Sequence, residues 1–397
     1  MGFKSVVWLF AALLGPMGLE AGGAQAHGYE VEYLFKGKSD GALPMARLID
    51  VAGKLYGTTS EGGCTYACCP SGCGTVYSID PATGMETVLY AFTGGADGSK
   101  PFAGLTKVGA KLYGTTQFGG SGAGVLFLLD PATNAQTVLY TFRGGTDAGY
   151  PVSDLVYLDG KLFGMSQGGG GTTCQGIGCG TIFSFDLASG AEAVVYAFKG
   201  SPDVLATYGN LLYFGGKLYG SGQGGATGHG AVFSVDPASG AEAVIYSFAA
   251  GADGQYPTNL SAFAGNLYGT TSSGGGAPAC APGCGTVFSL DPATGVETKL
   301  YTFQGGADGQ YPYTGLLEIN GTFYGVANAA GAAGSGTVFS FDPSANALTV
   351  LHSFRGGHDG AGPYAPLMRV GKRLYGSTEF AGRKGCQFCG TLFSLKP

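Results

Sequence analysis

Two short phrases recur seven times along this chain, and their spacing constrains the fold more than any other feature. The first phrase, Leu-Tyr-Gly or a near variant, ends at Gly57, Gly114, Gly164, Gly220, Gly269, Gly325 and Gly376. The second phrase, Gly-Thr-Val-Phe-Ser-x-Asp-Pro or a variant, opens at Gly74, Gly124, Gly180, Gly230, Gly285, Gly336 and Gly390. Copies of each phrase lie 49 to 57 residues apart, which is the period of a four-stranded propeller blade and not of a helical solenoid.

One repeat contains four strand-like segments. In residues 101–142 these are runs of six or seven residues, mostly rich in β-branched and aromatic side chains, at Phe102–Val108, Lys111–Thr116, Gly124–Asp130 and Thr137–Phe142. The last two are joined by Asp-Pro-Ala-Thr-Asn, in which Pro sets φ for the turn and the final Asn accepts a positive φ. Each repeat is therefore predicted to be one antiparallel blade.

The last repeat lacks its fourth segment, and a matching segment stands at the other end of the chain. The sequence ends at Lys396-Pro397, whereas Tyr29–Phe35 resembles the fourth-strand phrase of the first repeat. Docking this segment on the last blade leaves no major unpaired sheet edge. The sequence thus predicts an all-β fold, a seven-bladed β-propeller of four-stranded antiparallel blades closed by the N-terminal strand. An open β-solenoid is the rival, but it would need capping repeats that are not visible.

The first 26 residues have the pattern of a cleaved signal peptide. Lys4 precedes an apolar stretch from Val6 to Leu14, and Ala24-Gln25-Ala26 is a small-residue cleavage site. Residues 27–397 are then expected to form a single propeller domain, secreted or periplasmic. No other segment approaches the ~20 apolar residues of a membrane span.

The repeat resembles a known family. Leu-Tyr-Gly-Thr-Thr, Gly-Thr-Val-Phe-Ser and Gly-Gly-Ala-Asp-Gly are similar to the Gly-rich tandem repeat named for Gloeobacter and Verrucomicrobia, which implies a secreted bacterial protein and supplies no activity. A looser likeness is to kelch repeats, through paired glycines such as Gly62-Gly63 and Gly119-Gly120, although the kelch Trp is absent.

Charge is scarce, which excludes several classes of partner. Only 12% of the residues are charged and the net charge is −6, so no basic surface exists for nucleic acid or anionic lipid. No cofactor is expected, because His-x-His, His-Glu-x-x-His and phosphate-cradling loops are absent from the sequence. The expected partner is an extracellular glycan or protein, and the chain is expected to be a monomer.

Every cysteine falls in a link between the second and third strands. Those links emerge on the same face as the links between blades, which makes this loop face the candidate functional face. In an exported protein, local pairs favour disulfides: Cys174–Cys179, Cys280–Cys284 and Cys386–Cys389, with two more among Cys64, Cys68, Cys69 and Cys73. Free or redox-active thiols and zinc are the alternatives, since Cys386-x-x-Cys389 has ligand spacing.

One aspartate follows each fourth strand by five residues: Asp40, Asp97, Asp147, Asp203, Asp253, Asp308 and Asp359. The favoured interpretation is a tight turn in which the carboxylate accepts backbone N–H groups. The alternative is a carboxylate ring that binds a cation, with Asp97, Asp147, Asp253 and Asp308 as candidates.

Residues that break the repeat are better candidates for function. Four loop tyrosines could stack on sugars or peptides, or pack on neighbouring loops; with two loop cations they form the ligand-binding set Tyr150, Tyr256, Tyr311, Tyr364, Arg383 and Lys384. Acid–base chemistry would need a His and a carboxylate within reach of one substrate; the candidates are His358, Glu379 and Glu61, with solvated loop charges as the alternative.

We expect a non-catalytic binding propeller, with a carbohydrate-active lyase or hydrolase near blade 7, or a structural cell-surface protein, as alternatives.

Overall fold

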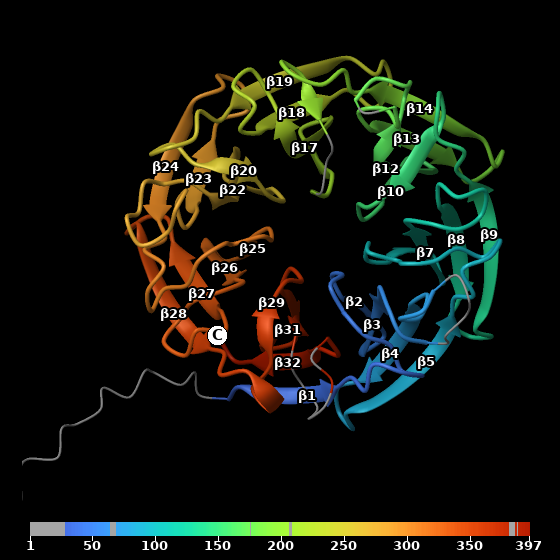
Figure 1. The fold of residues 1–397 in the computed structure, drawn as a ribbon, viewed down its shortest axis with the longest axis horizontal. Coiled ribbons are helices and arrows are strands. Elements are labelled where there is room, and N and C mark those ends of the chain that lie inside the picture. The colour runs from blue at the N-terminus through green and yellow to red at the C-terminus, as the bar shows by residue number, and fades with distance from the viewer. Residues whose placement is uncertain (1–27, 64–68, 175, 206–208, 381–385, 387) are drawn as a thin grey trace, which may run out of the picture.

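The described residues form a ring of seven antiparallel sheets around a central axis (Figure 1). The computed structural model describes all residues except 1–27, 64–68, 175, 206–208, 381–385 and 387. Each sheet contains a path of four consecutive strands, so the predicted seven-bladed propeller is confirmed. The predicted signal peptide lies outside the described residues. No helix in the described part of the chain is long and apolar enough to cross a membrane.

In blades 1 to 6 the strands run outward from the axis in chain order, and in blade 7 the N-terminal strand is outermost (Figure 1). The innermost are β2 (Ile49–Val51), β6 (Thr106–Val108), β11 (Val156–Leu158), β16 (Leu212–Phe214), β21 (Ser261–Phe263), β25 (Leu317–Ile319) and β30 (Met368–Val370). The second strands are β3 (Lys54–Thr59), β7 (Lys111–Thr116), β12 (Lys161–Gly169), β17 (Lys217–Gly224), β22 (Asn266–Ser273), β26 (Thr322–Ala327) and β31 (Arg373–Phe380).

The third and fourth strands carry the second repeated phrase and the closing Phe. The third are β4 (Thr75–Asp80), β8 (Val125–Asp130), β13 (Thr181–Asp186), β18 (Ala231–Val235), β23 (Thr286–Leu290), β27 (Thr337–Asp342) and β32 (Thr391–Leu395). The outermost are β5 (Met85–Ala91), β9 (Ala135–Thr141), β14 (Glu192–Ala197), β19 (Glu242–Ser247), β24 (Glu297–Thr302), β28 (Ala347–Ser353) and, in blade 7, β1 (Glu30–Leu34). Four blades also pair a short strand with the end of their second strand: β10 (Ala148–Pro151), β15 (Val204–Leu205), β20 (Gln255–Pro257) and β29 (Ala361–Pro363). One 3₁₀ turn is described, Gly357–Asp359.

The two repeated phrases recur together because they pack against each other across a strand pair. Gly114 of the first phrase lies directly opposite Phe127 of the second. A Cβ atom at Gly114 would come within 2.6 Å of the Phe127 ring, so a larger residue would displace the ring. The glycine leaves space for the Phe127 ring, which also packs against a neighbouring blade.

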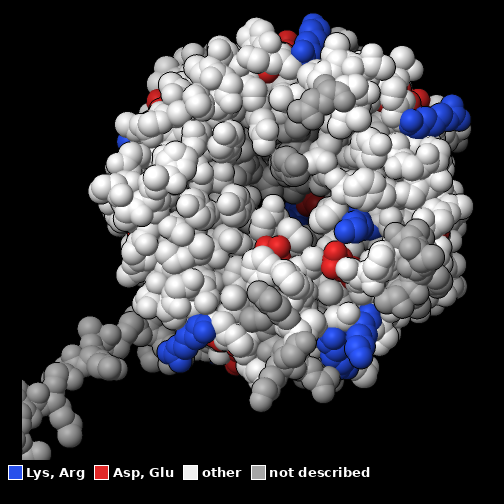
Figure 2. Space-filling view, in the orientation of Figure 1, with Lys and Arg blue, Asp and Glu red and all other residues white. Residues whose placement is uncertain are grey.

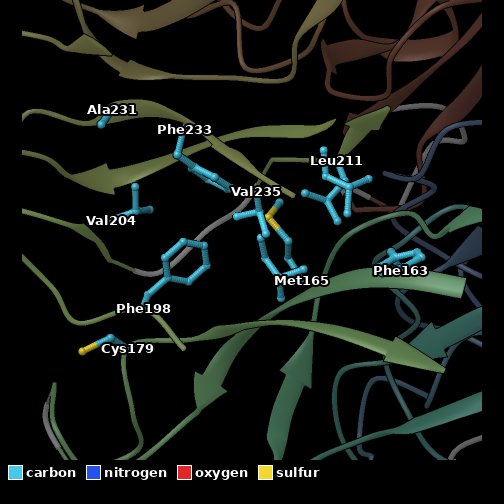
Figure 3. Packing of buried hydrophobic residues seen from close by; sticks show 11 residues of the cluster. Phe163, Met165, Cys179, Phe198, Val204, Leu211, Ala231, Phe233 and Val235 are labelled. Carbon is cyan, nitrogen blue, oxygen red and sulfur yellow. The ribbon is translucent and has the colours of Figure 1, made fainter. Parts of the chain in front are cut away.

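That aromatic side chain belongs to the contact between blades. The closing Phe of each fourth strand packs edge-on against the third-strand ring of the next blade, with ring centroids 4.9 to 5.3 Å apart. Figure 3 shows one such contact, in which Phe198 and Phe233 lie beside Met165 and Val235. Edge-to-face aromatic pairs stabilise a core beyond the area they bury. The core of this protein therefore lies between its blades.

The ring closes as predicted. β1 pairs antiparallel with β32 and so supplies the outer strand of blade 7. Phe35 is fully buried, and its ring lies 5.1 Å from that of Tyr77 in blade 1. Tyr29 stacks on His352 of blade 6 at 3.7 Å. The N-terminal segment thus joins three blades.

The innermost strands are shorter than predicted. The sequence predicts a strand over Phe102–Val108, whereas β6 contains only Thr106–Val108. The preceding residues leave the sheet because the Gly104 N–H donates to Asp154 Oδ1 of the next blade, at 2.6 Å. A contact that crosses between blades replaces the expected strand pairing.

Candidate functional site

A central cavity of about 720 Å³ opens on the loop face, lined by residues of all seven blades. Its walls come from the links between blades and from the ends of the second strands. Figure 2 shows a face that is mostly uncharged and hollowed at its centre, with acidic and basic atoms gathered near the hollow on the side of β2, β3 and β31. The ring therefore brings links from distant parts of the sequence together around one hollow.

Aromatic side chains from blades 5, 6 and 7 line one side of this cavity: Tyr256, Tyr313 and Tyr364. Tyr256 and Tyr313 are each 41% exposed. The rings of Tyr313 and Tyr364 lie 5.8 Å apart, and Tyr311 stacks on Tyr313 at 6.1 Å. Tyr311, Tyr313 and Tyr364 therefore form a continuous aromatic surface at and behind the cavity wall, and Tyr256 adds a further exposed ring.

Amide side chains from blades 2, 3 and 4 line another part of the wall. Gln117, Gln167 and Gln223 each stand three residues after the glycine of the first repeated phrase. Gln117 Nε2 donates to Gln167 Oε1 at 2.9 Å, whereas Gln167 Nε2 is buried with no partner among the described residues. At the same repeat position blade 5 has Ser272 and blade 7 has Glu379, so this position varies while the strand around it does not.

The floor of the cavity is a hydrogen-bonded chain that the sequence did not reveal. Asp154 is only 7% exposed. Its Oδ1 accepts from Gly104 N, its Oδ2 accepts from Asn210 Nδ2 at 3.0 Å, and Oδ2 also forms an ion pair with Arg47 Nε at 3.2 Å. Asn210 N in turn donates to Asn259 Oδ1 at 2.6 Å. The chain links blades 1 to 5. Aligning the residue that precedes the buried leucine of each inner strand would have pointed to it, because that position is polar in four repeats.

The predicted ligand-binding tyrosines divide into two groups. Tyr256 and Tyr364 line the cavity, and Tyr311 contacts it through Tyr313. Tyr150 instead packs against Phe118 with ring centroids 5.8 Å apart, and it is not among the described lining residues. Tyr313, which follows the loop proline as Tyr364 does, was not among the predicted residues. The two predicted cations, Arg383 and Lys384, lie outside the described residues.

The predicted catalytic candidates occupy different surroundings. Burial raises the pKa of Glu379, whose charge in turn helps to raise the pKa of Tyr313 at the cavity wall. Glu61 forms an ion pair with Lys100 at 3.3 Å. His358 lines a separate shallow hollow against β1, beside Val31 and Tyr33. Neither Glu379 nor a His is among the described residues that line the cavity.

The loop aspartates serve as turn acceptors. In six blades the Asp accepts from a fourth-strand Tyr and from a backbone N–H, as Asp253 does from Tyr246 at 3.0 Å and from Ala249 N at 2.6 Å. Asp97, Asp147 and Asp308 make the same pair of contacts. Blade 6 replaces the Tyr by His352, whose Nε2 lies 3.2 Å from Asp359. Within the described residues no group of three or more His, Cys, Asp or Glu side chains could hold a metal ion.

Four disulfides pin loops of this face in the described part of the chain. Three are the predicted pairs Cys174–Cys179, Cys280–Cys284 and Cys386–Cys389. The fourth is Cys69–Cys73, one of the pairings that the sequence left open in the first cysteine loop. The other two cysteines of that loop, Cys64 and Cys68, lie outside the described residues.

Solved structures similar to this chain share its fold at low sequence identity. An oligogalacturonate lyase in complex with manganese matches with a TM-score of 0.56 and 12% identity, over 94% of this chain and 98% of its own. An oligogalacturonate lyase from Vibrio parahaemolyticus matches with a TM-score of 0.54 and 10% identity, over 94% and 98%. The extracellular domain of a putative hybrid two-component system from B. thetaiotaomicron matches with a TM-score of 0.57 and 9% identity, over 92% of this chain and 39% of that one.

Sequence comparison identifies the family. A comparison with curated proteins gives no significant match. The model of the Gloeobacter/Verrucomicrobia repeat matches residues 23–177, 63–281 and 171–393. These overlapping matches cover nearly the whole chain, in agreement with the repeated phrases and the ring of equivalent blades. The chain therefore belongs to the Gloeobacter/Verrucomicrobia repeat family.

Proposed function

We propose that this protein is a secreted or periplasmic, non-catalytic propeller that binds a glycan chain in the central cavity of its loop face. The observation that carries the proposal is the lining of that cavity, with three tyrosines on one side and three glutamines on another. Tyrosine rings offer apolar faces with a polar edge, and amides both donate and accept hydrogen bonds. Sugars present the same combination of apolar ring faces and hydroxyl groups.

The size of the cavity and the disulfides support this role. Its volume of about 720 Å³ lies within the roughly 300–1,000 Å³ of small-molecule sites. Disulfides persist in oxidising compartments, and four are present in the described residues. The signal-peptide pattern of residues 1–26 agrees with export.

A glycan array probed with residues 27–397 tests the proposal. We expect at least one oligosaccharide to bind, and the Tyr313→Ala variant to bind it more weakly at an unchanged melting temperature. A blank array with the folded protein would contradict glycan binding and would favour another extracellular partner or a structural role at the cell surface.

An extracellular carbohydrate-active enzyme, a lyase or a hydrolase, is the second candidate. Glu379 favours it, because this carboxyl stands where blades 2, 3 and 4 have glutamine, and a raised pKa suits a general acid or base. The similar oligogalacturonate lyases are consistent with this candidate, but their likeness extends to the fold alone. Incubation of polysaccharides with wild type and Glu379→Gln decides: turnover that the substitution abolishes would favour the enzyme.

A further inference from the structure

The charges of the cavity floor compensate each other within the protein. Among the described residues that line the cavity, only Arg47 and Asp154 are charged. Their side chains are 3.2 Å apart, between Nε and Oδ2, and the Asp154 side chain is only 10% exposed. The Arg47 side chain is 49% exposed, so water screens the pair in part, but opposite charges this close still offset each other. The pair therefore presents little net charge to a ligand.

The acceptor capacity of Asp154 is already used. Its two oxygens accept from Gly104 N and Asn210 Nδ2, and Oδ2 is also held in the ion pair with Arg47 Nε. A cationic ligand would have to displace one of these donors to reach the carboxylate. Since a buried charge that loses a partner is costly, Asp154 is a poor counter-ion for a cationic sugar.

An anionic ligand is disfavoured for two reasons. Arg47 is the cation of the described lining, and its attraction is offset by Asp154 at 3.2 Å. The nearby Glu379 adds a carboxyl whose charge is felt by Tyr313 at the cavity wall. When ionised, Glu379 repels a carboxylate or sulfate placed against this tyrosine.

The other polar side chains of the described lining are neutral. Gln167 Nε2 and Thr314 Oγ1 line the cavity and have no hydrogen-bond partner among the described residues. Both atoms are buried, and Thr314 is only 3% exposed, whereas the amide of Gln223 on the same wall is exposed. Amide and hydroxyl groups match sugar hydroxyls, which both donate and accept.

Resting on the proposed function, we propose that the cavity selects an uncharged oligosaccharide over one that carries uronate or amino groups. The aromatic side contacts the apolar ring faces, and the exposed amides of the wall and the exposed half of Arg47 contact the hydroxyls. Asp154 acts by holding Arg47 and by keeping its charge compensated. It is a positioning residue that sets specificity.

Calorimetric titration of residues 27–397 tests the selection, using neutral cello-, xylo- and mannohexaose beside oligogalacturonate and chitosan oligomers. We expect a neutral hexasaccharide to bind about tenfold or more tightly than either charged class, because a hydrogen bond lost to an unmatched charge has about that effect. Tighter binding of a charged oligomer would overturn the selection and leave glycan binding intact. No binding by any sugar would overturn the proposed function as well.

The variant Asp154→Asn, with Asp253→Asn as its control, tests the role of the ion pair. Asp154→Asn leaves Arg47 uncompensated, so we expect affinity for oligogalacturonate to rise about tenfold, whereas Asp253→Asn, at a loop between blades, leaves it unchanged. An unchanged preference in folded Asp154→Asn would overturn the role of Asp154. If Asp154→Asn does not fold, the wild-type comparison of neutral with charged sugars still decides the selection.

Discussion

The seams are the contacts between blades, formed by the closing Phe and by the fourth-strand Tyr with its loop Asp. The seams and the central cavity come from the same repeat, but the seams keep the repeated residues whereas the cavity floor varies them. At the seams, every fourth strand places a Tyr, or His352 once, against the loop Asp, and a buried Phe against the next blade. At the cavity floor, the residue before the inner-strand leucine changes from blade to blade: Arg47, Gly104, Asp154, Asn210, Asn259, Gly315 and Pro366. The repeated residues form the contacts between equal blades, and the residues that differ between blades give an asymmetric surface that can orient an asymmetric ligand.

Removal of the N-terminal strand is the largest perturbation of the seams. We expect deletion of residues 29–35 to abolish cooperative folding or to cause aggregation, because blade 7 loses β1 and two seams lose Phe35 and Tyr29. The yield of monomer and the thermal melt measure this effect. An unchanged melting temperature in the truncated protein would rule out closure by β1.

Substitution of one seam aspartate is a smaller perturbation. We expect Asp253→Ala to lower the free energy of unfolding by about 1–3 kcal/mol, because the Tyr246 hydroxyl and the Ala249 N–H lose their acceptor. Glycan affinity should not change. Asp291→Ala, which removes an acceptor in an exposed hairpin turn, is the control and should cost less in a denaturant titration. An Asp253 variant with normal stability and altered binding would revive the cation-ring hypothesis.

The seams also predict a pH dependence. Burial and the neighbouring Asp raise the pKa of Glu86 to about 7, that of Glu192 to about 8 and that of Glu297 to about 7, and they raise that of Glu242. A carboxyl whose pKa is raised by folding stabilises the protein fully below its ordinary value of 4.5 and loses that effect as the pH rises through 7 to 8. We therefore expect a higher melting temperature at pH 5.5 than at pH 8.5.

Blade 2 supplies the natural control for this prediction, because Gln136 occupies the same position. Converting the four glutamates to Gln should flatten the melting temperature between pH 5.5 and 8.5. If the fourfold variant keeps the full pH dependence of wild type, other groups are responsible.

The smallest predicted effect concerns one aromatic ring of the cavity. We expect Tyr256→Ala to weaken oligosaccharide binding about fivefold, since an exposed stacking contact contributes about 1 kcal/mol. Tyr150→Ala is the matched control, because Tyr150 and Tyr256 both precede the loop proline with φ near +59° and +58° but only Tyr256 lines the described cavity. Equal losses of affinity in the two variants would place the site away from the cavity.

The sequence predicted the seams far better than the cavity. We could predict strands such as β7 and β8, the closure by β1 and three disulfides from features that recur along the chain. A contact that recurs in each blade requires similar residues in each repeat. The pairing of Asp154 with Arg47 could not be predicted in this way, since each residue occurs once in the repeats and the pair depends on how the ring brings blades 1 and 3 together. The shortened inner strands have the same cause, a contact between blades that local propensity does not contain.

Kd and melting temperature, measured together on Tyr313→Ala and Tyr246→Phe, separate the role of the cavity from that of the seams. Tyr313 lines the cavity, whereas the Tyr246 hydroxyl donates to Asp253 in a seam. We expect Tyr313→Ala to weaken binding of the neutral oligosaccharide about fivefold with little change in melting temperature, and Tyr246→Phe to lower the melting temperature with Kd unchanged. The reverse pattern, with Tyr246→Phe impairing binding and Tyr313→Ala only stability, would contradict the division between seams that stabilise and a cavity that binds.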